Sequence, residues 1–319
     1  MQFTDDAQAA VRADVPLLKE DTFESTLEGP FEYTLSEPNI CVLDFAAYQV
    51  DGGEPQGDTE VLKIDQRIRD THAVMRRGGQ MLQPWFVAQK PVKELCDLAL
   101  RYTFEVDTLP EWVDLVIEEP ENVTVEINGQ PLDLSDTKRW IDIAFHRIRI
   151  PAGVLQVGGN TIILKTRYTE NSNVEAIYLL GEFGVQLSGI QRRLVPLPDR
   201  VEIGDLCEQG FPFYSGGITY QLPLPEGASR IRLPEIGGAC AKVNGHTLGW
   251  DPFEADVSDT TAEVEVIISR RNTFGPLHDA ERYRYWNGPD HWTTEGDEFE
   301  PHPVLHPSGL LAAPMIKRK

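Results

Sequence analysis

The stretch CDLALRYTFEV, residues 96–106, decides the fold class. Apolar side chains occupy every second position from Cys96 to Val106, and polar or charged side chains fill most of the positions between them. A period of two places the apolar side chains on one face of a β-strand, whereas a helix needs a period near 3.6. The stretch therefore predicts a half-buried strand.

The same alternation recurs along the chain, at residues 123–127, 141–145, 162–164, 218–224 and 264–268. Helical periodicity is nearly absent, and the 23 prolines and 26 glycines separate short strands. Such a pattern is typical of antiparallel sandwiches and leaves no room for a catalytic (β/α)₈ barrel. With 319 residues, the chain is long enough for two domains. We therefore predict an all-β protein of two tandem antiparallel β-sandwiches.

A weak internal repeat supports two domains. In the first half Asn128-Gly129 follows alternating apolar residues and precedes Trp140, and in the second half an Asn-Gly pair at 244–245 precedes Trp250. Asn-Gly is the preferred pair of a type I′ hairpin turn, because both central residues need a positive φ. The interpretation predicts that both tryptophans lie in cores.

The predicted domains are a lead-in segment over residues 1–35, extended in form, a first sandwich over 36–190 and a second sandwich over 191–319 with a long, aromatic-rich C-terminal loop. The two sandwiches should meet between residues 187 and 205. Residues 211–214, with the sequence FPFY, should pack at or near this junction, since aromatic clusters beside glycines are usually core or interface.

The charge balance excludes several kinds of partner. With 29 basic and 51 acidic residues the net charge is −22, which opposes binding to nucleic acid, heparin or an anionic membrane. No apolar run reaches the ~20 residues of a membrane span, so we expect a soluble protein with no membrane insertion. The N-terminus lacks a signal-peptide pattern and resembles the interior of a longer chain, and the sequence leaves the location unknown. The four cysteines are widely spaced, which favours neither a disulfide scaffold nor a zinc site.

Several segments resemble known proteins. Residues 243–259 (VNGHTLGWDPFEADVSD) and 269–278 (SRRNTFGPLH) resemble the sugar-binding jelly-roll modules of glycoside hydrolase family 2 and related large bacterial glycosidases. Residues 173–185 (NVEAIYLLGEFGV), 209–220 (QGFPFYSGGITY) and 306–316 (HPSGLLAAPMI) are similar to C-terminal regions of very large family 2-like and family 106 rhamnosidase-like enzymes. The resemblance covers most of residues 36–319 and implies galactose-binding-like jelly rolls. The family has its catalytic carboxylates in a barrel that precedes these modules, so no catalytic residue is carried over and the catalytic residues stay unknown.

Carbohydrate recognition is the chemistry that the sequence motivates best. Sugar faces stack on aromatic rings, and sugar hydroxyls bond to Asn, Asp, Arg and His side chains. The C-terminal stretch mixes both types, and the predicted carbohydrate-binding residues are Asn272, His278, Tyr285, Trp286, His291 and Trp292. The alternative is that Trp286 and Trp292 dock this loop onto its own sandwich or onto another domain.

We expect no cofactor and assign no metal ligand. A structural calcium ion is the one exception that the sequence raises, because Asp251, Asp256 and Asp259 lie close together and hard oxygen sites occur in sandwich modules. The sequence lacks the spacing of an EF-hand.

Three functions remain open. The first is a non-catalytic accessory region of a bacterial glycoside hydrolase, which binds an oligosaccharide or polysaccharide and works with an upstream catalytic domain or subunit. The second is a self-sufficient glycoside hydrolase with a carboxylate active site in the cleft between the sandwiches. The third is a structural or partner-binding role. Activity of the isolated chain that a single Asp or Glu change abolishes would favour the second.

Overall fold

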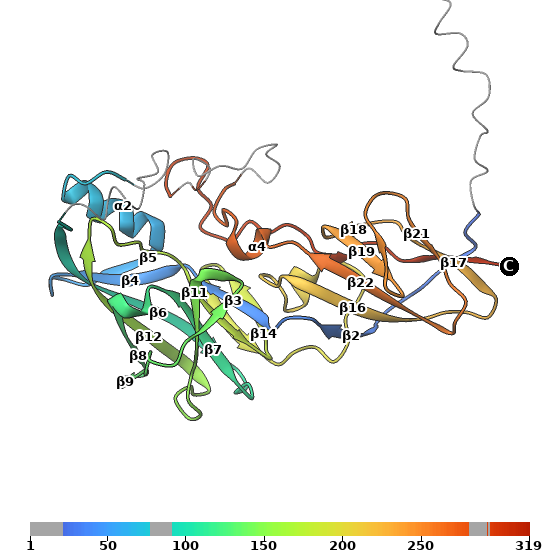
Figure 1. The fold of residues 1–319 in the computed structure, drawn as a ribbon, viewed down its shortest axis with the longest axis horizontal. Coiled ribbons are helices and arrows are strands. Elements are labelled where there is room, and N and C mark those ends of the chain that lie inside the picture. Colours follow the sequence, from blue (N-terminus) through green and yellow to red (C-terminus); the bar gives the residue numbers. More distant parts are fainter. Residues whose placement is uncertain (1–21, 77–90, 281–291, 293) are drawn as a thin grey trace, which may run out of the picture.

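The computed structural model describes residues 22–76, 91–280, 292 and 294–319. Two β-sandwiches lie end to end along the long axis of the molecule, and a long connection within the second one, beginning after Ile268, runs back over the first (Figure 1). Almost all strand pairs are antiparallel, which confirms the predicted fold class. One pair differs, because β15 joins β6 in a parallel direction through Arg193 and Leu194.

The first sandwich consists of a five-stranded and an eight-stranded sheet. The smaller sheet has the order β10 (Lys138–Trp140), β11 (Asp142–Arg149), β7 (Val113–Glu118), β13 (Ile177–Gly181) and β3 (Asn39–Leu43). The larger sheet has the order β14 (Gly184–Ser188), β15 (Gln191–Val195), β6 (Glu94–Val106), β12 (Gly158–Thr169), β8 (Val123–Ile127) and β9 (Gln130–Pro131), with β4 (Phe45–Val50) between β6 and β5 (Gln56–Glu60). A single-turn helix η1 (Pro120–Asn122) leads into β8.

Strand β6 is the strand that the alternation predicts. Its even-numbered residues from Cys96 to Val106 are buried and belong to one hydrophobic core, while most residues between them are exposed. Burying such side chains stabilises a fold by about 1.5 to 3 kcal/mol each. Strand β12 pairs with β6 along nearly its full length, so these two strands form the centre of the larger sheet.

Helix α2 (Val61–Thr71) is an element that the period-two pattern did not predict. It follows β5 directly, and the buried residues Val61, Ile64 and Ile68 face the core of the first sandwich. Their spacing of three and four residues is helical, but it extends over only one short segment. The side chain of Glu60 caps the helix.

The second sandwich has two main sheets and a short two-stranded one. The first sheet has the order β1 (Ser25–Thr26), β24 (Met315–Arg318), β17 (Ala228–Leu233) and β21 (Phe253–Asp256). The second has the order β2 (Glu32–Leu35), β16 (Gly216–Pro223), β22 (Thr261–Ile268), β19 (Cys240–Val243) and β20 (His246–Leu248), and β18 (Ile236–Gly237) pairs with β23 (Gly309–Leu310).

The strand pairing differs from the predicted domains at two places. Strands β1 and β2 fall in the predicted lead-in, yet they pair with β24 and β16 of the second sandwich. Strand β15 falls in the predicted second sandwich, yet it pairs with β14 and β6 of the first. Both differences arise because pairing over long sequence separations leaves no local pattern in the sequence.

The aromatic segment 211–214 lies at the junction, as predicted. Phe213 belongs to the core of the first sandwich, whereas Phe211 and Tyr214 belong to the core of the second. The short helix η2 (Leu206–Gln209) precedes this segment, and Asn39 of β3 donates to the carbonyls of Phe183 and Gly210 at 2.7 and 2.9 Å. The junction is therefore packed and hydrogen-bonded.

The two repeated tryptophans have different environments. Trp140 on β10 is buried in the first core, as predicted. Trp250 is 81% exposed, so the prediction of a core residue is wrong for it. The cause is local, because Trp250 lies in the connection between β20 and β21 and not on a strand that faces a core.

No helix in the described part of the chain is both long and apolar enough to span a bilayer.

Candidate functional site

A cleft opens where three separate parts of the chain meet, namely the five-stranded sheet, the start of α2 and the segment around α4 (Arg271–Phe274). We call it the junction cleft. Its enclosed volume is about 80 Å³, and about 540 Å³ when the open mouth is included. It is lined by Val42, Asp44, Glu60, Val61, Leu62, Glu175, Ala176, Tyr178, Thr273, Phe274, Gly275, Pro276, Leu277, His278 and Trp292.

A buried ionic network forms the floor of the cleft. Asp44 follows β3 and accepts a hydrogen bond of 2.9 Å from Arg192 through Oδ1 and lies 3.0 Å from His278 Nε2 through Oδ2. Arg192 also donates to the carbonyls of Val42 and Gly189 and lies over the ring of Phe213. The His278 Nδ1 proton is donated to the Glu300 carbonyl at 2.8 Å. The network therefore ties the segment after α4 to the first sandwich.

The two ionisable partners stabilise each other's charged form. Burial alone would raise the pKa of Asp44, but the charge of Arg192 and the hydrogen bond from His278 outweigh it, and the net pKa is lowered. Burial alone would lower the pKa of His278, yet the hydrogen bond and the charge of Asp44 raise it above its usual value. With both ring nitrogens engaged, His278 acts as a donor at two places.

Glu60 forms the wall between the network and α2. Its two carboxylate oxygens accept the backbone N–H groups of Leu62 and Lys63 at 3.1 and 2.9 Å, which caps the helix. The residue is 5% exposed. Burial raises the pKa of Glu60 to about 7, against the lowering effect of the two amides. A carboxyl group that titrates near neutral pH therefore lines the cleft.

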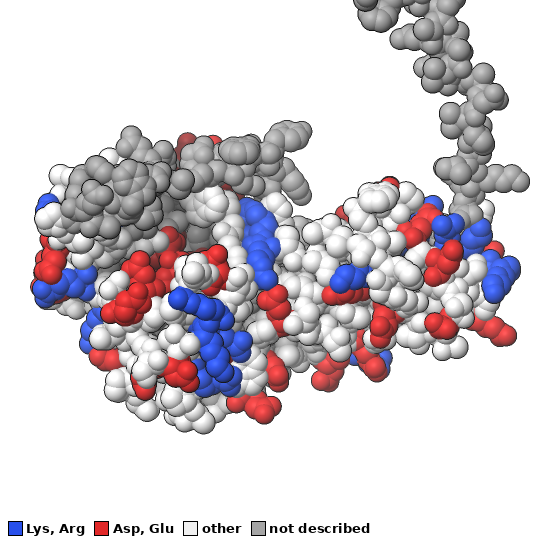
Figure 2. Space-filling view, in the orientation of Figure 1, with Lys and Arg blue, Asp and Glu red and all other residues white. Residues whose placement is uncertain are grey.

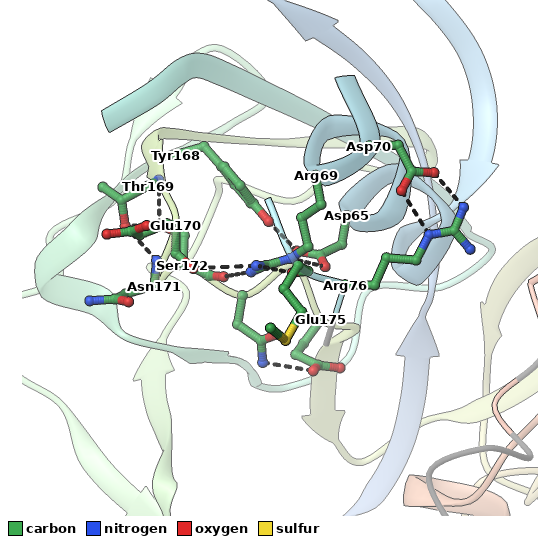
Figure 3. Close-up of polar contacts among 12 residues, drawn as sticks. Asp65, Arg69, Asp70, Arg76, Tyr168, Thr169, Glu170, Asn171, Ser172 and Glu175 are labelled. Atoms are coloured by element: carbon green, nitrogen blue, oxygen red, sulfur yellow. Dashed lines mark hydrogen bonds and ion pairs between the residues drawn. The ribbon is translucent and has the colours of Figure 1, made fainter. Parts of the chain in front are cut away.

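A second buried ion pair holds α2 in place. Arg69 donates to Asp65 at 2.7 Å and to the carbonyls of Met75, Glu170 and Ser172 (Figure 3). The hydroxyl of Tyr168 on β12 donates to the other oxygen of Asp65. The pair joins the helix to the loop after β12, and this loop leads to Glu175. Two walls of the junction cleft are thus positioned by one guanidinium group.

Aromatic packing holds α4 on the outer face of the five-stranded sheet. The ring of Phe274 stacks on Phe145 at 5.1 Å and contacts Trp140 and Tyr178 at 5.7 and 5.5 Å. Every residue of β3 and β13 is buried, because this face of the sheet is covered as well as the face toward the core. The cleft is therefore built on a rigid base.

The chemistry of the mouth suits a polar, ring-shaped ligand. Trp292 and Glu175 are both half-buried at the cleft, and Glu175 accepts a hydrogen bond of 2.7 Å from Asn173. Small-molecule sites are usually concave and combine apolar walls with a few fixed polar groups. The enclosed 80 Å³ is too small for a sugar ring, so a sugar would lie across the mouth.

Comparisons with known proteins give structural neighbours only. No protein-family model matches the sequence, and no curated protein matches it. A β-D-mannosidase from Dictyoglomus thermophilum is similar in structure, with a TM-score of 0.30, 10% identity and coverage of 78% of this chain and 33% of that chain. A β-glucuronidase from Ruminococcus gnavus gives a TM-score of 0.30, 8% identity and coverage of 76% and 42%. A family 2 β-galacturonidase from Eisenbergiella tayi gives a TM-score of 0.25 and 10% identity, with coverage of 77% of this chain and 38% of that chain.

The chain thus matches between a third and 42% of the length of these glycosidases. Their printed descriptions name mannosidase, glucuronidase and galacturonidase, so the family 106 part of the sequence resemblance finds no support among them. A TM-score near 0.3 carries no inference about activity, substrate or partner. Any function must be argued from this chain's own residues.

The structure places the predicted carbohydrate-binding residues in different environments. His278 and Trp292 both line the junction cleft, but the ring nitrogens of His278 are occupied by Asp44 and Glu300. Asn272 lines a separate pocket, and its amide bonds to the backbone of His306 in both directions, at 2.8 and 2.9 Å. It therefore fastens two loops together. Tyr285, Trp286 and His291 lie outside the described residues.

The sequence reasoning missed Asp44, Glu60 and Glu175. One signal was present for Asp44, since a carboxylate directly after the apolar run ICVL, residues 40–43, is out of place unless it is paired. A second was present for Glu60, since an acidic residue before Val61, Ile64 and Ile68 marks a helix start. No signal marked Glu175.

Within residues 22–76, 91–280, 292 and 294–319, no three His, Cys, Asp or Glu side chains are placed to share a metal ion. Asp251, Asp256 and Asp259, which the sequence suggested for calcium, are among these described residues. Asp256 lies 3.7 Å from the Arg230 guanidinium.

Proposed function

We propose that this chain is a non-catalytic, carbohydrate-binding region of a glycoside hydrolase, and that a glycan binds across the mouth of the junction cleft. The observation that carries the proposal is the convergence at one opening of Trp292 with Glu175 and Tyr178, which lie more than a hundred residues earlier in the sequence. The proposal that the chain is a region of a glycoside hydrolase rests on the sequence resemblance of residues 209–220 and 243–259. The catalytic carboxylates would come from another domain or subunit.

The physical basis is the match between the mouth and a pyranose ring. The indole of Trp292 would stack on the apolar face of a sugar, and the carboxylate of Glu175 would accept hydrogen bonds from ring hydroxyls. The buried network of Asp44, Arg192 and His278 would hold the surrounding segments, because a site is precise only when its support is rigid.

Replacing Trp292 with alanine tests the proposal. Loss of one stacking contact should weaken oligosaccharide binding about tenfold, since such contacts contribute on the order of 1 kcal/mol or more. The melting temperature should change little, because the side chain is only half-buried. Isothermal titration calorimetry against a panel of neutral oligosaccharides, with a melting curve on each variant, gives both quantities.

Trp250→Ala is the matched control. This tryptophan is 81% exposed on the second sandwich, far from the cleft, so its removal should leave affinity and stability unchanged. If Trp292→Ala instead lowers the stability by several kcal/mol and leaves the affinity of the folded protein intact, the ring only docks its segment and the proposal fails.

A self-sufficient glycoside hydrolase is the second candidate, and one observation favours it. Glu60, whose pKa burial raises to about 7, lines the same cleft as Glu175, and a pair of carboxyl groups with different pKa values can act as general acid and base. Glu60 already caps α2, which accounts for its position without catalysis. Hydrolysis of aryl glycosides by the purified chain, abolished in Glu175→Gln and in Glu60→Gln, would replace the accessory role with this one.

A further inference from the structure

Two arginines on the outer face of the five-stranded sheet share one buried carboxylate. Arg147 and Arg149 lie two residues apart on β11, and the Nε atom of each contacts a different oxygen of Asp114 on β7. The carboxylate is only 4% exposed, whereas the two arginine side chains are 27% and 57% exposed. Both guanidinium groups also lie over the ring of Trp112, at 5.2 and 4.7 Å from its centre.

These contacts leave the outer edge of each guanidinium group available. Among the residues that the structure describes, the terminal nitrogens of Arg147 and Arg149 make no hydrogen bond, and both side chains pair with the same carboxylate, that of Asp114. Because the Nε atoms and the Trp112 ring fix both groups, their terminal N–H donors are held in position before any ligand arrives. Arginine in this arrangement suits an oxyanion, which it binds through two parallel hydrogen bonds.

A third cation lies beside the pair. Lys138 on β10 is directly opposite Arg147 in the strand register, so the two side chains share a face, and within the described part of the chain the Lys138 amine has no partner. The same face carries Asp114 and Glu118, which leaves it one positive charge in excess in a protein of net charge −22. Figure 2 shows Lys and Arg side chains gathered in one elongated group over β7 and β11.

We propose that Arg147 and Arg149, held by Asp114 and Trp112, form a binding site for an oxyanion carried by an acidic polysaccharide. The net charge of the protein selects the kind of ligand. Each further anionic group of a densely charged polymer meets a repulsive surface, whereas a chain with widely spaced carboxylates or sulfates can place a single group here. That the carrier is a glycan rests on the proposed function, but the anion chemistry does not.

The site is separate from the junction cleft, although both are on the outer face of the five-stranded sheet. Tyr178 of the cleft lies two strands from Arg147, through Val116, which corresponds to about 10 Å. The ring of Phe274 covers the sheet between them. A neutral glycan in the cleft and an acidic group at the arginine pair would therefore be recognised by different side chains.

The test measures binding of the full chain to four probes at low salt. Hyaluronan oligosaccharides carry one carboxylate per disaccharide, sparsely sulfated dextran carries isolated sulfates, unmodified dextran carries no charge, and duplex DNA is densely charged. Wild-type protein should bind the first or the second probe and lose that binding as salt is raised, and which of the two it binds identifies the oxyanion. Binding to neither acidic glycan at millimolar concentration, or tighter binding to DNA, would overturn the proposal.

Four variants separate this site from general charge effects. Arg149→Gln should lower the affinity for the acidic glycan about tenfold, and Arg149→Lys should also lower it because the fork geometry is lost. Asp114→Asn should also lower the affinity, because an amide offers one acceptor oxygen and no charge, so it no longer holds both guanidinium groups in position. Arg167→Gln is the matched control: this exposed arginine is already paired with Glu94 and Asp97 on the other sheet, so its loss should have no effect.

Equal losses in Arg149→Gln and Arg167→Gln would show a non-specific charge effect and contradict the inference. A melting curve on each variant shows that it is folded, and Arg149→Lys keeps the charge if Arg149→Gln is unstable. Trp292→Ala distinguishes the two proposals. If this change leaves all binding intact while Arg149→Gln weakens binding of the acidic glycan, the cleft proposal fails and the arginine site stands.

Discussion

Two opposing effects act on the pKa of Glu60. As the cap of α2 it accepts two backbone N–H groups, which favour its charged form, but burial at 5% exposure disfavours that form. Burial is the stronger effect, and the pKa rises to about 7. A helix cap at an exposed site would have the opposite shift. The charge state of this residue therefore changes in the range where most binding measurements are made.

The raised pKa of Glu60 predicts how stability depends on pH. Above pH 4.5 the unfolded chain releases the Glu60 proton while the folded protein keeps it up to about pH 7, so the free energy of unfolding falls across this interval, by roughly 3 kcal/mol. In Glu60→Gln the decline between pH 4.5 and 6.5 should be absent. Urea unfolding of both proteins at pH 4.5, 5.5, 6.5 and 7.5 measures it, and equal slopes would refute the assignment.

His278 also makes the free energy of unfolding fall as the pH rises. Its folded pKa is raised, so the stability that its charged form contributes is fully present below the unfolded pKa of 6.5 and is lost as the pH rises through the folded value. The Glu60→Gln variant should therefore still lose some stability above pH 6.5, whereas Glu60→Gln combined with His278→Gln should not. The lowered pKa of Asp44 acts only at acidic pH, where its contribution is lost.

At the level of single residues, local patterns in the sequence predicted what depends on near neighbours. Asn128 and Gly129 have positive φ values of 52° and 78°, as the Asn-Gly signal requires. The sequence could not distinguish Trp140 from Trp250, because burial depends on what packs over the residue and not on its position after a turn. The sequence predicted that the His278 side chain would bind carbohydrate. In the structure its Nε2 atom is hydrogen-bonded to Asp44, which lies more than two hundred residues earlier in the sequence.

The position of helix α2 depends on the buried ion pair between Arg69 and Asp65. Arg69 bonds to Asp65 and to three backbone carbonyls, and it is 2% exposed. Removing the guanidinium group would leave the Asp65 carboxylate buried without its counter-ion. Such losses cost about 3 to 5 kcal/mol, because the remaining charge has no compensation.

We therefore expect Arg69→Ala to lower the melting temperature by several degrees and to weaken binding at the junction cleft, because α2 carries one wall of it. Arg76→Ala is the control near the same helix. It removes an exposed ion pair with Asp70, and its melting temperature should equal that of the wild type. Equal effects of both changes would show that the buried pair does not hold the helix.

Among the elements, those with a long alternating pattern were predictable, and those with short or mixed patterns were not. β6 and β22 alternate over many residues, and both are strands where the pattern predicts them. The segment 61–71 has only three core residues and is flanked by charged ones, so a search for strands passes over it. The junction cleft needed α2, α4 and β13 together, and no single stretch of sequence contains that information.

On the scale of the whole molecule, the second sandwich includes both ends of the described chain. β1 pairs with β24 through Ser25 and Ile316, and β2 forms an edge of the other sheet beside β16. The composition predicted two sandwiches, but the N-terminal strands carry few residues and no strong alternation. Their place is determined by partners far away in the sequence.

A chain that begins at residue 36 lacks β1 and β2. We expect its second sandwich to lose protection of backbone amides against hydrogen exchange at β16, β17 and β24, because two edges of its sheets lose their partners. The amides of β6 and β12 should stay protected, since the first sandwich keeps all its strands. A chain that begins at residue 22 keeps both strands and is the reference. Uniform loss of protection would show that the two sandwiches unfold as one unit.

The pairing of β1 with β24 also matters while the protein is being made. Ser25 leaves the ribosome long before its partner Ile316, because the two residues lie near opposite ends of the described chain. After β15 is complete at Val195, roughly 120 residues must still be added, which takes on the order of 6 to 25 s at usual elongation rates. Throughout this time the first strands remain unpaired in the nascent chain. They would be the natural contact point for a ribosome-bound chaperone.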